Sequence, residues 1–244
     1  MRWRGIPSYQ QHWHSKGVQH WMHFGEYRFS EDLDFTLQQP LEPEALFAAF
    51  DDLFRKLQQE SGITFRRSPD PPVRHTRNDT FYLIYKGPLP AESSVKVDVT
   101  RGETLVFALE RKPVIRTYAE FSDLPEDPML LVYSFPEIAV EKTLAVTDDA
   151  RREPRDLYDL WYIQEAGHLP HPEDLVDGLS RKLASREGRA DDVLVPRLER
   201  VEKMLARTWD SRLRRQVQQL PEFDACFRNV KRLLADFDRL RGFG

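Results

Sequence analysis

The sequence predicts an α+β fold in which strands and one helix come first and helices complete the chain. Residues 94–100 alternate valines with polar residues, as a half-buried strand does. After Pro136 the apolar residues recur at spacings of three and four, which is the period of amphipathic helices. Prolines punctuate residues 120–136, between these two patterns. We therefore expect two domains, at residues 1–130 and 131–244.

The elements of the first domain follow from local patterns. Residues 1–24 hold three of the five tryptophans and four of the seven histidines without a helix or strand period, so we expect an irregular leader. Residues 44–60 predict an amphipathic helix, because apolar side chains recur at Leu46, Phe47, Phe50, Leu53, Phe54 and Leu57. Aromatic, β-branched or alternating residues predict strands at 32–35, 80–86, 94–100 and 104–108.

The second domain is expected to consist of helices. Apolar periodicity, with a closing glycine at Gly167, predicts helices over 137–146, 155–166, 173–183, 193–220 and 223–240. Cys226 falls within the apolar stripe of the last helix, so we expect it in the core. As the single cysteine of the chain, it excludes both an internal disulfide and a cysteine-based zinc site.

Charge is distributed unevenly along the chain. The 244 residues carry a net charge of −4, which excludes a globally basic protein that coats nucleic acid. From Arg181 onward there are 16 basic and 10 acidic residues, a net of +6, so the rest of the chain carries −10. An acidic front and a basic back suit a metal-binding half beside a half that binds a polyanion, or simply helices with solvated arginine faces. No apolar run approaches ~18 residues and no signal sequence is evident, so we expect a cytoplasmic protein.

Asp32 and Asp34 are the most informative pair of side chains. Residues two apart on a strand point to the same face, so this Asp-Leu-Asp segment holds two carboxylates side by side. Their repulsion is relieved by a cation, and Mg²⁺ takes oxygen ligands while keeping places for phosphate. Such pairs also occur by chance.

Asp98 is a candidate third carboxylate for the same site. It shares the polar face of its strand with Lys96, and a third acid on a neighbouring strand is what a two-metal phosphoryl-transfer site requires. An exposed Lys/Asp face on an antiparallel sheet explains the same pattern.

A further charged cluster is expected between two of the predicted helices. Asp156 and Asp159 share a helix face, and Lys142 lies on the preceding helix. The lysine could bind a nucleotide phosphate, or it could form an ion pair that pins the two helices together.

Taken in order, these segments resemble the AbiEii-type nucleotidyltransferase toxins, a branch of the polymerase-β-like nucleotidyltransferase superfamily. The resemblance covers about residues 24–165. It is carried by Arg28-Phe29-Ser30-Glu31-Asp32-Leu33-Asp34-Phe35, Lys96-Val97-Asp98, Glu137-Ile138-Ala139-Val140-Glu141-Lys142 and Arg155-Asp156-Leu157-Tyr158-Asp159-Leu160. It implies a mixed sheet flanked by helices and followed by a helical domain.

The resemblance also implies an activity and its partners. The activity is transfer of a nucleotide from an NTP, with Mg²⁺, to the 3′ end of a tRNA, within a toxin-antitoxin system of phage defence. The implied partner is a separately encoded antitoxin with a winged-helix region. Asp32, Asp34 and Asp98 would hold metal, and Lys142 and Asp156 would be catalytic, Lys142 contacting the phosphates and Asp156 orienting the acceptor. The implied nucleotide-binding residues are Gly17, Ser30, Lys96, Lys142 and Asp159.

The chain departs from the family pattern ahead of the first motif. Family members have a Gly-Gly or Gly-Ser/Thr turn there, whose backbone N–H groups hold the triphosphate. Here Gly17 is followed by Val18 and Gln19, and a β-branched valine resists a positive φ. Three explanations remain: a truncated or frameshifted start, a degraded and inactive toxin, or another mode of phosphate binding.

Two alternative functions remain beside the toxin. The first is a catalytically inactive protein of the same fold that binds RNA or an antitoxin through its basic C-terminal helices. The second is transfer of a nucleotide to a small molecule.

Overall fold

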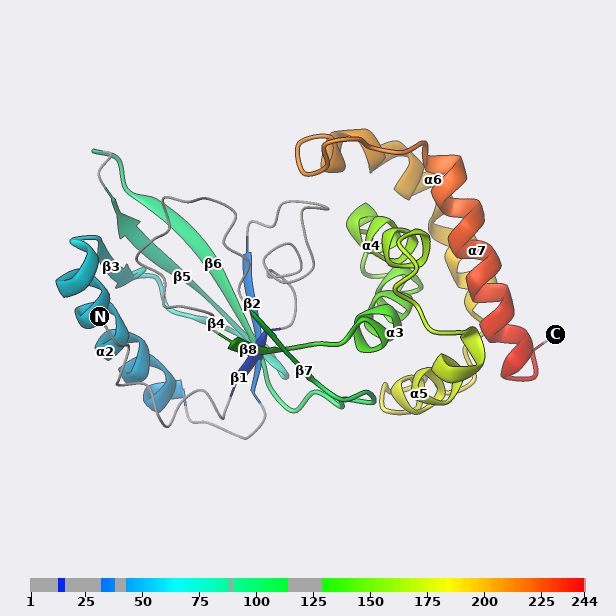
Figure 1. The fold of residues 1–244 in the computed structure, drawn as a ribbon, viewed down its shortest axis with the longest axis horizontal. Helices are drawn as coiled ribbons and strands as arrows, with labels where there is room; N and C mark the ends of the chain where they lie inside the picture. The colour runs from blue at the N-terminus through cyan, green and yellow to red at the C-terminus, as the bar shows by residue number, and fades with distance from the viewer. Residues whose placement is uncertain (1–12, 16–31, 38–42, 88–89, 114–128, 244) are drawn as a thin grey trace. The chain divides into compact units, whose positions relative to one another are not determined.

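The computed structural model describes residues 13–15, 32–37, 43–87, 90–113 and 129–243 (Figure 1). They divide into two compact units. The first holds the strands and one helix, and the second holds residues 104–110 together with the chain from Tyr133 onward. Within the described residues, every helix is too short or too polar to cross a membrane.

The described residues of the first unit include a mixed sheet of eight strands. Its strands are β1 (Trp13–Ser15), β2 (Asp32–Leu37), β3 (Thr64–Arg67), β4 (Val73–Arg74), β5 (Asn78–Lys86), β6 (Ser93–Thr100), β7 (Glu110–Pro113) and β8 (Met129–Val132). Their order is β3-β5-β6-β2-β1-β8-β7, and β4 pairs with β5. The β2–β6 and β1–β8 pairs are parallel, whereas β5 runs antiparallel to β6. The two strands that carry the predicted carboxylates are therefore direct neighbours.

Helix α2 (Pro43–Ser61) covers one face of this sheet (Figure 1). The alternating valines and aromatics of β5 and β6 point to that face and pack against Phe50 and Phe54 of the helix. Val97 and Val99 are fully buried there. Because side chains alternate along a strand, the polar residues between the valines must stand on the opposite face. That alternation assigns Asp32, Asp34 and Asp98 to the face away from α2.

In the described residues of the second unit, five helices surround one apolar core. They are α3 (Phe135–Val146), α4 (Pro154–Glu165), α5 (Pro172–Ala184), α6 (Leu194–Leu213) and α7 (Phe223–Leu240). Cys226 is fully buried in this core, as the apolar stripe predicts. Burial and the nearby charge of Glu165 raise the pKa of its thiol to about 12, so the thiol stays protonated at neutral pH. Cys226 is therefore a core residue without a reactive thiolate.

Three sequence expectations differ from the structure. Residues 104–108 form no strand, because the carboxylate of Glu137 takes up the backbone N–H groups of Val106 and Phe107. The next strand is β7, which starts at Glu110. The leader, expected to be irregular, contributes the short strand β1, which pairs with β2 and β8.

The third difference concerns α6, which ends at Leu213 and not at residue 220. Beyond it the chain turns back. The indole N–H of Trp209 donates to the carbonyl of Pro221 at 2.9 Å, and Val217 is buried within the turn. Val217 keeps its core position without continuing the helix, which is why apolar spacing alone extends the helix too far.

Candidate active site

The three predicted carboxylates come together on one face of the sheet. In the parallel β2–β6 pair, Asp34 is the register partner of Asp98, and Asp32 is the partner of Lys96. On the other side of β6, Thr80 of β5 lies opposite Asp98. Neighbouring strands are about 4.8 Å apart, and partners in register present their side chains to the same face. The fold therefore builds a polar patch from β5 and β6, which follow one another in the chain, and from β2, which is distant from them in sequence.

Asp98 is held as an anion by three neighbours on this face. The hydroxyl of Thr80 donates to its Oδ1, the amide of Asn78 donates to the same oxygen at 3.4 Å, and the Lys96 ammonium donates to Oδ2. Burial opposes the charged form, but the hydrogen bonds from Lys96 and Thr80 and the charge of Lys96 outweigh it and lower the pKa of Asp98. Asp98 is thus ionised over the whole neutral range.

The pKa of Lys96 shifts in the opposite direction to that of Asp98. Burial disfavours its ammonium form, yet the hydrogen bond to Asp98 and the charges of Asp98, Asp32 and Asp34 outweigh that effect and raise its pKa. The lysine is therefore a permanent positive charge amid the three carboxylates.

The chemistry of the donors fits a hard divalent cation. Asp32, Asp34 and Asp98 offer only carboxylate oxygens, which Mg²⁺ prefers, and Asp32 and Asp34 are partly exposed. As arranged in the described part of the chain, no three His, Cys, Asp or Glu side chains form a ready metal cage. In this arrangement the ammonium of Lys96 balances the carboxylates, and the same carboxylate oxygens are suited to binding a metal cation.

In the second unit, Lys142 of α3 joins α4 through a buried charge cluster. Its ammonium lies 2.8 Å from Asp156 Oδ1 and 2.6 Å from Asp159 Oδ2, and both aspartates are 0% exposed. Arg151 Nε adds a contact of 2.7 Å to Asp156 Oδ2. Burial opposes ionisation of Asp156, but the charges and hydrogen bonds of Lys142 and Arg151 outweigh it and lower its pKa.

This cluster brings together all three residues that the sequence singled out on these helices. An ammonium has three N–H donors, and two are directed to the aspartates, which leaves one for another acceptor. The Lys142 side chain is 15% exposed. The geometry is that of an ion cluster that pins α3 to α4, and its lysine side chain keeps a small exposed fraction.

A second buried ion pair was missed by sequence reasoning. Lys182 of α5 is fully buried and donates to Glu137 Oε1 at 2.8 Å and to the carbonyl of Thr104. The other oxygen of Glu137 accepts the backbone N–H groups of Val106 at 2.9 Å and Phe107 at 2.8 Å. Glu137 therefore fastens the segment that follows β6 onto α3 and α5. An acid and a base on otherwise apolar helix faces were the only sequence signal.

Two predicted nucleotide-binding residues, Gly17 and Ser30, lie outside the described residues, as does the whole stretch around Val18 that departs from the family turn.

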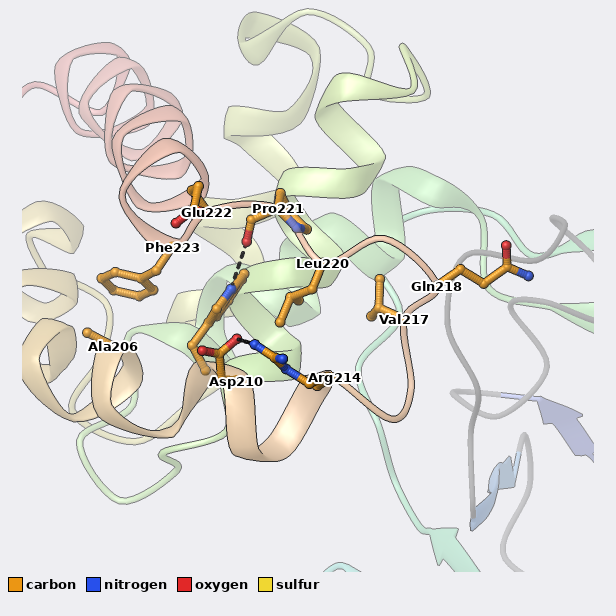
Figure 2. Close-up of a pocket in the computed structure, with 10 residues that line it drawn as sticks. Ala206, Asp210, Arg214, Val217, Gln218, Leu220, Pro221, Glu222 and Phe223 are labelled. Carbon is orange, nitrogen blue, oxygen red and sulfur yellow. Dashed lines mark hydrogen bonds and ion pairs between the residues drawn. The ribbon is translucent and has the colours of Figure 1, made fainter.

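A pocket lies beside the turn between α6 and α7, and its lining contains none of the predicted site residues that the structure describes (Figure 2). Trp209, Leu220 and Phe223 contribute its apolar lining. Arg214, which also lines it, is paired with Asp210 at 3.2 Å. The pocket is the inner surface of the chain reversal. Its carboxylates are Asp210, which is held by Arg214, and Glu222.

Comparisons with known proteins agree with this architecture. The chain matches MenT4, a nucleotidyltransferase toxin from Mycobacterium tuberculosis, with a TM-score of 0.59 over 96% of this chain and 80% of that one. At 18% identity this is a likeness of fold. A search of curated proteins found no match. The model of the AbiEii nucleotidyl transferase toxins of type IV toxin-antitoxin systems matches residues 21–229. The chain therefore belongs to the AbiEii nucleotidyltransferase toxin family.

Proposed function

We propose that this chain transfers a nucleotide from an NTP to an RNA acceptor in a Mg²⁺-dependent reaction, with the 3′ end of tRNA as the acceptor. The observation that carries the proposal is the register of Asp34 with Asp98 on adjacent strands. Family membership supports nucleotidyl transfer as the chemistry. The substrates and an antitoxin partner with a winged-helix region are those that the family resemblance implies. The cytoplasm is the location that we propose with them.

In this proposal Asp32, Asp34 and Asp98 hold the metal. Bound there, Mg²⁺ would lower the pKa of the attacking hydroxyl and neutralise the triphosphate. Thr80 and Asn78 keep Asp98 ionised and aimed, because both donate to its Oδ1. Lys96 and Ser30 are proposed to assist at the phosphates, together with Gly17, whose sequence neighbours depart from the family motif. Lys96 has the raised pKa that keeps a phosphate ligand charged.

Lys142 is proposed to contact the phosphates through the donor that Asp156 and Asp159 leave available. Both oxygens of Asp156 are engaged by Lys142 and Arg151. We therefore assign Asp156 and Asp159 to positioning Lys142. This assignment replaces direct contact of Asp156 with the acceptor, because a carboxylate with 0% exposure does not reach a substrate.

A basic stripe on α6 supports an RNA acceptor. Arg200, Lys203 and Arg207 of α6, and Arg214 directly after its last residue, are exposed and recur at spacings of three, four and seven, so they lie on one side. The apolar side of α6 is buried against the core. Such a row of cations neutralises successive phosphates of a nucleic acid backbone. We name these four residues the α6 stripe.

Labelled NTPs, Mg²⁺ and bulk tRNA test the proposal. Because Val18 and Gln19 replace the family glycine turn, we expect slow, Mg²⁺-dependent labelling of RNA that Asp34→Asn abolishes. Robust labelling that Asp32→Ala abolishes would show that the glycine turn is dispensable. Labelling of an aminoglycoside but never of RNA would move the substrate class to small molecules.

One observation favours a second candidate, a non-catalytic protein that binds RNA or an antitoxin. Lys96 and Lys142 each already pair with carboxylates of the chain. Thermal shift separates the two functions. Stabilisation by Mg²⁺ and NTP that disappears in Asp34→Asn supports the enzyme, whereas no shift together with salt-sensitive RNA binding supports the binder.

A further inference from the structure

Tyr82 is an exposed aromatic residue on the face of the sheet that carries the three aspartates. It lies in the middle of β5, and its side chain is 45% exposed. Its neighbours Phe81 and Leu83 point to the opposite face and are buried against α2. Among the described residues, the Tyr82 side chain forms no hydrogen bond and no ring contact. A large amphipathic ring thus stands open on an otherwise polar patch.

The sheet register places this ring beside the charged groups. Tyr82 is the partner of Lys96, which is in turn the partner of Asp32. These three residues form one row across β5, β6 and β2, and the next row is Thr80, Asp98 and Asp34. At about 4.8 Å between strands, the Cα of Tyr82 lies roughly 5 Å from that of Lys96 and roughly 10 Å from that of Asp32. The aromatic ring of Tyr82, the ammonium of Lys96 and the carboxylate of Asp32 thus follow one another across a single row.

We propose that Tyr82 is a stacking platform for a nucleobase, on a face whose carboxylates and Lys96 hold the phosphate end of the same ligand. This inference rests on the proposed function and adds to it the residue that binds the base. Every base has a flat π surface, so an aromatic side chain binds bases with little sequence preference. A tyrosine on a paired central strand is already ordered, so little conformational freedom is lost on binding.

A second tyrosine on the same strand provides a matched control. Tyr85 is 37% exposed, and its ring lies 6.2 Å from that of Phe65. Three residues from Tyr82, it points to the α2 side of the sheet. Tyr85→Ala therefore removes a comparable exposed ring from the same strand without touching the carboxylate face.

Calorimetric binding of two ligands with Mg²⁺ tests the proposal: a non-hydrolysable NTP and inorganic tripolyphosphate, which has no base. We expect Tyr82→Ala to weaken NTP binding by about 5- to 150-fold, the loss typical of one stacked base. Tripolyphosphate binding should stay unchanged. Tyr82→Phe and Tyr82→Trp should bind NTP like the wild type, and Tyr85→Ala should as well.

The possible outcomes distinguish failure of the proposed function from failure of the stacking role of Tyr82 alone. If the wild type binds neither ligand, the proposed function fails, and this inference fails with it. If the wild type binds both ligands and Tyr82→Ala leaves NTP and RNA binding intact, or weakens both ligands equally, only the stacking role is overturned. If NTP binding is kept but binding of a short single-stranded RNA falls by a similar factor, stacking on the NTP base is overturned and the ring contacts the acceptor instead.

Discussion

At the scale of single residues, each predicted cluster of acids contains one lysine that offsets their repulsion. Lys96 does so on the sheet, where it is partly exposed, and Lys142 does so between two helices, where its partners are fully buried. Burial makes the difference, because a buried carboxylate without a cation is far more costly than an exposed one. A ligand can therefore displace Lys96 from its carboxylate partner at a lower cost in free energy than it could displace Lys142.

Thr80→Val tests how Asp98 is kept ionised. The hydroxyl of Thr80 donates to the charged carboxylate, so its loss should raise the pKa of Asp98. Carbon-13 NMR titration of the aspartate carboxyl measures the shift. Thr100→Val, on the same face of β6, is the control and should leave that pKa unchanged. A lower pKa in Thr80→Val would contradict the assigned cause.

Asp156→Asn tests the buried cluster through pH. The folded-state pKa of Asp156 lies below its ordinary value of 3.8, so its contribution is fully present above that value and disappears as the pH falls through the folded-state pKa. At pH 7 the variant should be less stable by about 3–5 kcal/mol, as is typical when one partner of a buried pair is removed.

Urea unfolding at several pH values provides the measurement. The difference between wild type and Asp156→Asn should shrink as the pH falls from about 3.8, where the carboxylate is protonated in the unfolded chain, through the lower folded-state pKa, below which it is neutral in the folded wild type too. Asp236→Asn, which breaks an exposed pair with Arg239, should cost less than about 1 kcal/mol. A pH-independent difference would show that Asp156 is not ionised in the folded protein.

At the scale of elements, a close approach fixes the segment after β6 against α5. A Cβ placed on Gly178 would meet Phe107 Cε2 and Cζ at 2.5 Å, which is much closer than atoms normally pack. Glu137 and Lys182 hold the same segment from its backbone side. Glycine inside a helix is otherwise unfavourable, so its presence here reflects the space that the ring needs.

The effect of Gly178→Ala on stability should therefore have opposite signs in the presence and in the absence of the Phe107 ring. In the wild-type background it should destabilise the protein, because Phe107 must move. In a Phe107→Ala background the same change should stabilise the protein by about 1 kcal/mol, the helix preference of alanine over glycine. Thermal unfolding of the four proteins of this double-mutant cycle measures both effects. The same sign in both backgrounds would exclude the ring contact as the reason for the glycine.

At the scale of the whole molecule, charge is segregated along the chain. The residues from Arg181 onward carry a net of +6 in a chain whose total is −4. The carboxylates of the proposed metal site lie in the acidic part, and the α6 stripe lies in the basic part. Such segregation lets one protein attract both a cation and a polyanion, and this attraction depends on salt concentration.

Lys203→Ala with Arg207→Ala tests the α6 stripe. If both side chains bind phosphates, RNA affinity should fall, and the slope of log K against log salt should decrease by about 0.7–0.9 for each phosphate that is no longer neutralised. Arg228→Ala with Arg232→Ala removes the same charge from exposed positions of α7 and serves as the control. Fluorescence anisotropy at several salt concentrations measures both. Equal effects of the two pairs would mean that net charge alone governs binding.

Local patterns determined most of the elements. The apolar spacing over residues 44–60 matches α2, and the alternation over 94–100 matches β6, because both depend only on which side of a regular element faces the core. The pairing of Asp32 with Asp34 on one face follows from the same rule. At the end of α6 the apolar spacing continues to Val217 although the chain turns back after Leu213, so the spacing predicts the wrong helix boundary.

The sequence by itself therefore determined which carboxylates share a strand and which helices the chain forms, because side-chain direction within an element is set by its own period. Only the tertiary structure decided that Asp34 stands beside Asp98, that Tyr82 stands beside Lys96, and that Glu137 holds the backbone of Val106 and Phe107. Strand register and long-range hydrogen bonds depend on contacts between distant segments, and no local pattern encodes them.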